Sequence, residues 1–113
     1  MTRPSKAPEP PAHLSTEAQA WWRKVIGDYL LESHHLKVLQ AACEAWDRCQ
    51  QARDQIAVEG LTFNDKHGQP RAHPCVAIER DARIAFARLV RELALDCEPP
   101  AEVRPPRIAG ARN

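Results

Sequence analysis

Prolines divide this chain more sharply than any other residue type. The 113-residue sequence holds ten of them, and eight fall near the ends, at positions 4, 8, 10 and 11 and at positions 99, 100, 105 and 106. Because proline lacks a backbone N–H and does not fit the interior of a helix, both ends favour extended chain. We therefore predict a flexible proline-rich arm over residues 1–13, one folded domain over residues 14–97, and a flexible tail over residues 98–113.

The charge balance limits the classes of partner. Sixteen Lys and Arg against 15 Asp and Glu give a formal net charge of +1, which excludes a generally basic nucleic-acid-binding surface but leaves local patches open. No apolar run approaches the ~20 residues of a membrane-spanning helix, and the first residues lack the apolar stretch of a secretion signal. We expect a soluble intracellular protein with no membrane partner.

Two amphipathic helices are predicted in the first half of the chain. Ser15 caps the first, whose apolar positions are 18, 21, 22, 25, 26, 29 and 30. The second runs over residues 34–59, with Ser33 as its cap and Gly60 ending it in a left-handed turn. At ~1.5 Å per residue this helix is about 39 Å long, so it should extend past its own domain.

The second half of the chain predicts a hairpin and a third helix. Residues 61–63 and 69–72 have strand character, and residues 64–68 between them are rich in turn formers. His73 and Pro74 then begin a helix that runs to about Ala94. The predicted fold class is mainly α: three helices with a long central helix and a short β-hairpin between helices 2 and 3, flanked by disordered proline-rich arms.

The long helix carries two apolar faces, and two faces require two partners. Leu36, Leu39 and Cys43 form a bulky face together with Trp46. The other face is a seam of mostly small residues at heptad-like spacing, which permits close helix approach. We expect helices of the same chain to cover one face and a second copy to use the other, with the subunit interface made by Val38, Ala42, Ala45, Trp46, Cys49, Ala52 and Ile56.

The titratable residues do not predict an enzyme. Histidines and cysteines lack the spacing of a CxxC pair or an HExxH helix, and Cys43 and Cys49 lie about 120° apart around a helix. We find no paired carboxylates and no nucleophile with a base at suitable spacing. We predict no metal, no cofactor and no catalytic activity.

Packing and surface ion pairs explain most of the aromatic and basic side chains on the helices. Trp22 and Trp46 fall among apolar residues, which indicates packing, whereas Trp21 is less determined. Four arginines give the third helix a basic stripe, but Glu79 and Glu92 are spaced four residues from Arg83 and Arg88. That spacing predicts solvated ion pairs.

A set of short motifs follows in a fixed order along residues 8–95. It comprises Pro10-Pro11-Ala12-His13-Leu14-Ser15-Thr16-Glu17-Ala18, then Trp22, a helix ending at Gly60, Gly60-Leu61-Thr62-Phe63 with Gly68, and His73-Pro74. This order resembles the small terminase subunits of tailed phages, in particular the P27-like group. The C-terminal end departs from the family, because Ala94-Leu95-Asp96 stands where relatives tend to continue Gly-Leu-Thr-Pro.

The resemblance implies a non-catalytic, ring-forming adaptor. Such a homo-oligomer would bind double-stranded DNA of a phage, prophage or satellite in the cytoplasm of the bacterial host. It would present that DNA to the terminase large subunit, the ATPase and nuclease of genome packaging. Because the tail is short, its contact with the large subunit would be peptide-like, through Arg104 and Arg107.

A ring would also change the meaning of the small net charge. It repeats every local cation around its axis, so a modest patch becomes a belt that faces phosphates. The candidate DNA-binding residues lie on the first arm, on the polar face of the first helix and in the hairpin: Arg3, Lys6, Arg23, Lys24, Lys66 and Arg71. No recognition helix is evident, so we expect moderate sequence specificity.

A small helical DNA-binding regulator or antitoxin-like dimer is the alternative. It explains the helices and the arms equally well, but it does not explain the segment from Gly60 to Pro74. The measured mass separates the two classes, since a dimer favours the regulator and a larger ring favours the terminase.

Overall fold

The structure is a computed structural model that describes residues 7–94. Its elements follow in the order α1 (Thr16–Asp28), α2 (Ser33–Glu59), β1 (Thr62–Asn64), β2 (Pro70–Ala72) and α3 (Pro74–Leu93). The predicted fold class is confirmed in its helices and in the hairpin between α2 and α3. The expected tail over residues 98–113 and the first six residues of the expected arm lie outside the described residues.

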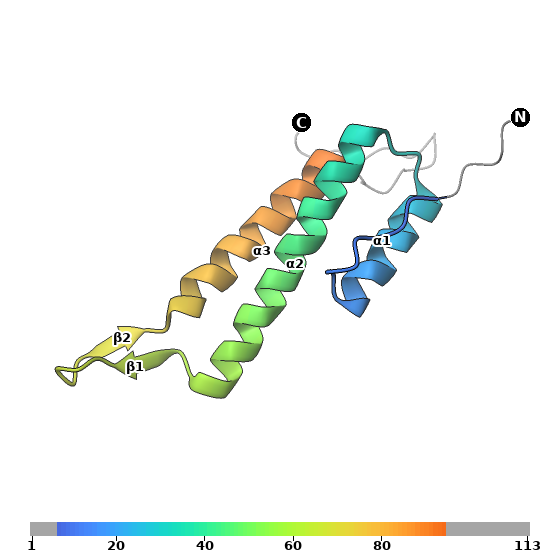
Figure 1. Ribbon diagram of the computed structural model, residues 1–113. Helices are drawn as coiled ribbons and strands as arrows, with labels where there is room; N and C mark the ends of the chain where they lie inside the picture. Colours follow the sequence, from blue (N-terminus) through green and yellow to red (C-terminus); the bar gives the residue numbers. More distant parts are fainter. Residues whose placement is uncertain (1–6, 95–113) are drawn as a thin grey trace, which may run out of the picture.

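The long helix α2 is the axis on which the other helices pack. Figure 1 shows α1 and α3 alongside it, with the β-hairpin beyond the end of α2 that lies far from α1. At ~1.5 Å per residue, the 27 residues of α2 span about 40 Å and the 13 residues of α1 about 20 Å. Helix α2 therefore extends past the part of the molecule that α1 covers, and α3 runs alongside it there (Figure 1).

The core lies where α1, the first half of α2 and the end of α3 meet. Leu39 and Cys43 are fully buried there. The Trp22 indole N–H donates to the Pro8 carbonyl at 3.0 Å, so this buried ring keeps a hydrogen-bond partner. Burial is also the main reason that the pKa of the Cys43 thiol is raised to about 12, and the thiol donates to the Ala18 carbonyl at 3.7 Å. The buried cluster comprises Leu14, Ala18, Trp22, Val25, Leu39, Cys43 and Leu93.

Polar contacts fix α1 on α2. Ser15 is the N-cap of α1: its hydroxyl accepts from the Ala18 N–H at 3.0 Å and donates to Asp47 Oδ1 at 2.6 Å. The backbone N–H of Ser15 donates to the other oxygen of Asp47 at 2.8 Å. The predicted cap therefore also anchors the start of α1 to the middle of α2.

Residues 7–13, the described part of the expected arm, contact the helices. Besides the bond from Trp22 to Pro8, His13 Nε2 lies 2.7 Å from Glu44 Oε2 of α2. Glu9 Oε1 lies 3.9 Å from Arg23 of α1. The boundary of the folded domain at residue 14 stays a prediction.

The structure corrects the expected role of the small-residue seam of α2. Ala42, Cys49 and Ala52 are at most 2% exposed in the single chain, and α3 packs along this side of α2. Because Cys49 of the seam contacts Glu79 of α3, the seam lies on the side of α2 that faces α3. Both faces of α2 are thus covered by the same chain, the bulky one by α1 and the seam by α3, so these three residues cannot contact a second copy in this arrangement.

Two local expectations are also wrong. Glu32, not Ser33, is the N-cap of α2, because Glu32 and His35 form a reciprocal capping box. Helix α1 ends at Asp28, and the extended backbone of Tyr29 turns the chain out of the helix. Leu30, expected on the apolar stripe, is consequently 98% exposed.

Gly60 ends α2 and Pro74 begins α3, as the sequence predicts. Gly60 is the C-cap of α2 with a φ of 92°, a positive value that glycine adopts without a Cβ clash, but its ψ of 166° lies outside the expected left-handed turn. Pro74 occupies the first turn of α3, and His73 is the N-cap, its Nδ1 accepting from the Cys75 N–H at 3.0 Å.

The core assignment predicts a large difference between two leucine truncations. Leu39→Ala should lower the free energy of unfolding by about 2–5 kcal/mol, because it leaves a cavity in the buried cluster. Leu30→Ala removes the same atoms from an exposed position and should change stability by less than about 0.5 kcal/mol. Denaturant unfolding at one fixed protein concentration measures both, and equal losses would contradict this location of the core.

Candidate functional site

The polar face of α1 presents two of the predicted DNA-binding cations. The Arg23 and Lys24 side chains are 59% and 73% exposed. Arg23 lies 3.9 Å from Glu9, and Lys24 lies 3.0 Å from Asp28 one turn ahead. Exposed pairs of this kind contribute at most about 1 kcal/mol and are screened by salt, so a phosphate can replace either carboxylate.

The β-hairpin presents the second pair of predicted cations on a turn organised by Asp65. Strands β1 and β2 pair antiparallel, with Phe63 opposite Arg71. Asp65 Oδ1 accepts from the backbone N–H groups of His67 at 2.8 Å and Gln69 at 2.9 Å. Its Oδ2 accepts from Arg71 Nε at 2.9 Å. These bonds, led by the one from Gln69, lower the pKa of Asp65.

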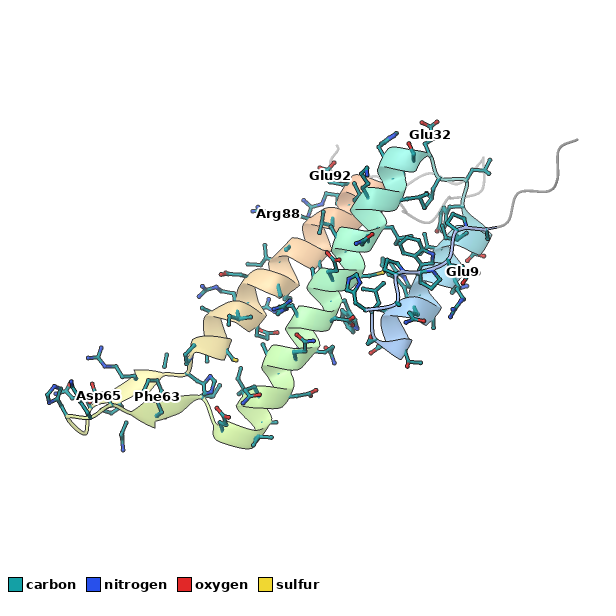
Figure 2. The ribbon with its side chains drawn as sticks, viewed as in Figure 1. Glu9, Glu32, Phe63, Asp65, Arg88 and Glu92 are labelled. Carbon is teal, nitrogen blue, oxygen red and sulfur yellow. The ribbon has the colours of Figure 1, made fainter. Side chains whose placement is uncertain are left out.

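Lys66 projects from this turn and forms no ion pair with another described residue. Arg71 remains 62% exposed despite its contact with Asp65. Figure 2 shows the labelled Asp65 and Phe63 at the hairpin, far along the molecule from Glu9 beside α1. Within one chain, the structure therefore does not bring the two pairs of cations together, and Arg3 and Lys6 lie outside the described residues.

The basic stripe of α3 divides into paired and exposed parts. The predicted pair of Arg83 with Glu79 is formed at 3.3 Å, and Arg80 contacts Asp81 at 3.1 Å. Arg88 and Arg91 are exposed and form no ion pair with a described residue. The predicted pair of Arg88 with Glu92 is absent among the described contacts, although both side chains project from the last turns of α3 (Figure 2).

Polar contacts tie the end of α2 to the start of α3. Because His73 Nδ1 accepts from the Cys75 N–H, the proton of the neutral ring is assigned to Nε2, which donates to Glu59 Oε1 at 2.6 Å. This bond and one from Gln55 lower the pKa of Glu59. Further along, burial raises the pKa of Glu79, but hydrogen bonds from Arg53, Arg83 and Cys49 outweigh it and lower the pKa overall.

The described residues assemble no metal-binding cluster. Within residues 7–94, no three His, Cys, Asp or Glu side chains are grouped so that they could hold an ion. Burial, followed by the contact with Glu79, raises the pKa of Cys49, and burial does the same for Cys43. Both thiols are therefore protonated at neutral pH, the form that is neither nucleophilic nor metal-binding.

None of the described helices combines the length and the apolarity needed to cross a membrane.

Sequence reasoning missed an aromatic cluster where the three helices meet. Trp21 of α1 and Trp46 of α2 both lie against Phe86 of α3, with ring centroids 5.6 Å and 5.2 Å away. All three rings are half-buried and line a hollow of about 180 Å³ together with Glu17 and Ala18. Periodicity placed Trp46 on an apolar face, but no local pattern indicates that rings from three elements converge.

Helices α2 and α3 form a long helical hairpin, with the short helix α1 packed at one end and exposed cations at both ends, so the fold is that of a small helical module. The chain belongs to the phage terminase small subunit family, whose profile matches residues 18–107. The match begins at residue 18, inside α1, and covers α2, the hairpin and α3, and it confirms the resemblance read from the sequence. The protein therefore has a role in phage DNA packaging. Comparisons with curated proteins and with solved structures give no significant match.

The lowered pKa of Asp65 predicts an acid-sensitive hairpin. A carboxyl group whose folded pKa is depressed stabilises the fold above its unfolded pKa, and this stabilisation is lost as the pH falls through the folded value. Asp65→Asn keeps the acceptor Oδ1 but cannot titrate. It should therefore show a smaller loss of unfolding free energy than the native protein between about pH 7 and pH 3.

Glu92→Gln is the matched control, since Glu92 is an exposed carboxylate that hydrogen-bonds to no other described residue. Its loss on acidification should equal that of the native protein. Identical pH profiles for the Asp65 and Glu92 variants, measured by denaturant unfolding, would show that Asp65 does not organise the turn.

Proposed function

We propose that this protein is the non-catalytic adaptor of a genome-packaging terminase. It assembles as a ring, binds double-stranded DNA, and presents it to the terminase large subunit in the cytoplasm of the bacterial host. The observation that carries this proposal is the family match over residues 18–107. The weakly paired cations on α1 and on the hairpin support DNA binding as the contribution of this subunit.

The ring interface lies at the hairpin end of the molecule. A two-stranded hairpin alone is marginally stable in water, and every residue of β1 and β2 is exposed in the single chain. Beyond the region that α1 covers, α2 and α3 are a two-helix layer on which no third element of residues 7–94 packs (Figure 1). Apolar side chains stay exposed there: Val58 at 82%, Leu61 at 62%, Phe63 at 45% and Ile78 at 41%.

A second copy covers this apolar end and gives the hairpin a neighbour. Ile56, which belongs to the interface expected from the sequence, is half-buried and lies in the last turns of α2 at the hairpin end, so it stays in the proposed interface. Ala42, Cys49 and Ala52 do not, because α3 already buries them. Val38 packs against the core, and Trp46 lies against Phe86.

Repetition of the same cations around the ring then supplies the affinity for DNA. A single chain with a formal net charge of +1 attracts DNA weakly. In a ring, Arg23 and Lys24 of each subunit, with Arg3 and Lys6 of the preceding segment, form a belt that can follow the phosphates. Lys66 and Arg71 form a second belt at the hairpin end.

Arg104 and Arg107 remain the proposed contacts with the large subunit. They lie outside the described residues and within the segment that the family profile matches. The alternative, a dimeric regulator or antitoxin-like protein, loses support because the family match covers the segment from Gly60 to Pro74 that this alternative did not explain.

Charge reversal on α1 tests the DNA contacts. Arg23→Glu with Lys24→Glu should weaken DNA binding and reduce the slope of log affinity against log salt by roughly 2 for each subunit that contacts DNA. Lys37→Glu with Arg48→Glu makes the same charge change on exposed positions of α2 and should cost less affinity. Fluorescence anisotropy over a salt series measures both, and equal effects would reject Arg23 and Lys24 as phosphate contacts.

Charged substitutions at the hairpin end test the ring. Val58→Asp with Phe63→Asp should reduce the assembly to monomers, because two buried carboxylates in an apolar interface have no counter-charge. Leu30→Asp, at a more exposed site outside that end, should leave the mass unchanged. Light scattering at micromolar concentration gives the masses, with circular dichroism as the check on folding. An unchanged mass for the double variant would place the interface elsewhere.

A further inference from the structure

A furrow runs between α1 and α3, with α2 beneath it. Its upper part, near the end of α3, is a hollow of about 250 Å³ lined by Trp21, Lys24, Val25, Asp28, Tyr29 and Val90. The hollow of about 180 Å³ at the aromatic cluster adjoins it, since Trp21 lines both. The furrow is thus continuous from Val90 to Phe86 along α3.

The aromatic hollow of the furrow is mainly apolar but incompletely covered. Trp21, Trp46 and Phe86 are each half-buried, although large aromatic side chains contribute most when they are removed from water. Aromatic-lined grooves of this kind accept extended proline-rich segments, because a polyproline II chain has little conformational entropy left to lose.

An acidic hollow between the start of α1 and α2 adjoins the lower end of the furrow. This hollow of about 370 Å³ shares Glu17 with the aromatic one and is also lined by Asp47 and Asp54, with no Lys or Arg among the described residues that line it. Asp47 is engaged by Ser15. Glu17 and Asp54 hydrogen-bond to no other described residue, so their carboxylates are available to a basic ligand.

The described chain ends at the upper mouth of this furrow. Val90 lies one turn before Ala94. Ala94 adopts the left-handed conformation, with φ 54° and ψ 44°, and its N–H donates to the Arg91 carbonyl. A left-handed C-cap turns the following residues away from the helix axis and back toward its preceding turns.

We propose that residues 95–108 of the same chain dock in this furrow as an extended segment. Pro99 and Pro100 lie on the aromatic cluster, and Arg104 and Arg107 face the acidic end. At ~3.1 Å per residue, ten to thirteen residues of polyproline II chain span about 31–40 Å, enough to pass α1, which is about 20 Å long.

Charge complementarity at the acidic end and chain length select this occupant. The later part of the segment is basic at Arg104 and Arg107 and meets the hollow that carries Glu17 and Asp54, whereas Lys24 at the upper end is already paired with Asp28. Docking would hold Arg104 and Arg107 on the subunit itself, so a partner that binds this segment would have to release it first.

Acrylamide quenching of tryptophan fluorescence in the full chain tests the proposal. Acrylamide is neutral, so charge changes do not alter its local concentration. Arg104→Glu with Arg107→Glu should expose Trp21 and Trp46, raise the quenching constant and shift the emission to longer wavelength. Trp21→Phe and Trp46→Phe each remove part of this change. Arg3→Glu with Lys6→Glu makes the same charge change at the other end of the chain and should leave the quenching as it is in the native protein.

Reversal of the acidic charges beside the furrow provides the complementary experiment. Glu17→Lys with Asp54→Arg, placed in the Arg104→Glu/Arg107→Glu chain, should restore the native quenching constant. Quenching that is unchanged by reversal of the tail, or not restored by the furrow variants, would overturn the proposal. A tail effect that disappears in the monomeric Val58→Asp/Phe63→Asp chain would assign the segment to a neighbouring copy, and would overturn docking in its own furrow.

Discussion

The close packing of α3 on the small-residue face of α2 is the contact on which the rest of the structure depends. Ala42, Cys49 and Ala52 leave room for α3 to approach along the length of α2, and all three are buried as a result. This contact sets the β-hairpin at one end of the molecule and closes the core around Leu39 and Leu93 at the other. It also leaves the furrow between α1 and α3, because both helices pack on α2 with few contacts to each other.

The elements could be predicted because their determinants are local. Apolar periodicity, the Ser15 cap, Gly60 and Pro74 each act within one or two turns, and the structure has the helices and the hairpin where these features indicate. The partner of the seam could not be predicted, since a stripe of small residues fits a helix of the same chain and a helix of another copy equally well. The aromatic cluster was missed for a similar reason: Trp21, Trp46 and Phe86 come from three elements, and their convergence depends on how those elements pack.

The candidate DNA-binding cations of α1 and the hairpin form only weak, solvent-exposed ion pairs. Arg23, Lys24 and Arg71 each lie near a carboxylate, yet their side chains stay at least 59% exposed. Breaking such exposed ion pairs costs little free energy, so these cations can exchange their carboxylate partners for the phosphates of a polyanion. The α1 and hairpin cations lie too far apart in the chain's fold to form one patch, and an assembly that repeats each set is the arrangement in which they would act together (Figure 1).

The central claim is that assembly, and not the single chain, creates the DNA-binding surface. The most direct test is the salt dependence of DNA affinity for the native protein beside that for the Val58→Asp/Phe63→Asp chain, which retains every basic residue. We predict a steep slope of log affinity against log salt for the native assembly, and a shallow slope with much weaker binding for the monomer. Equal slopes and affinities for the two would show that one subunit suffices and would contradict the account.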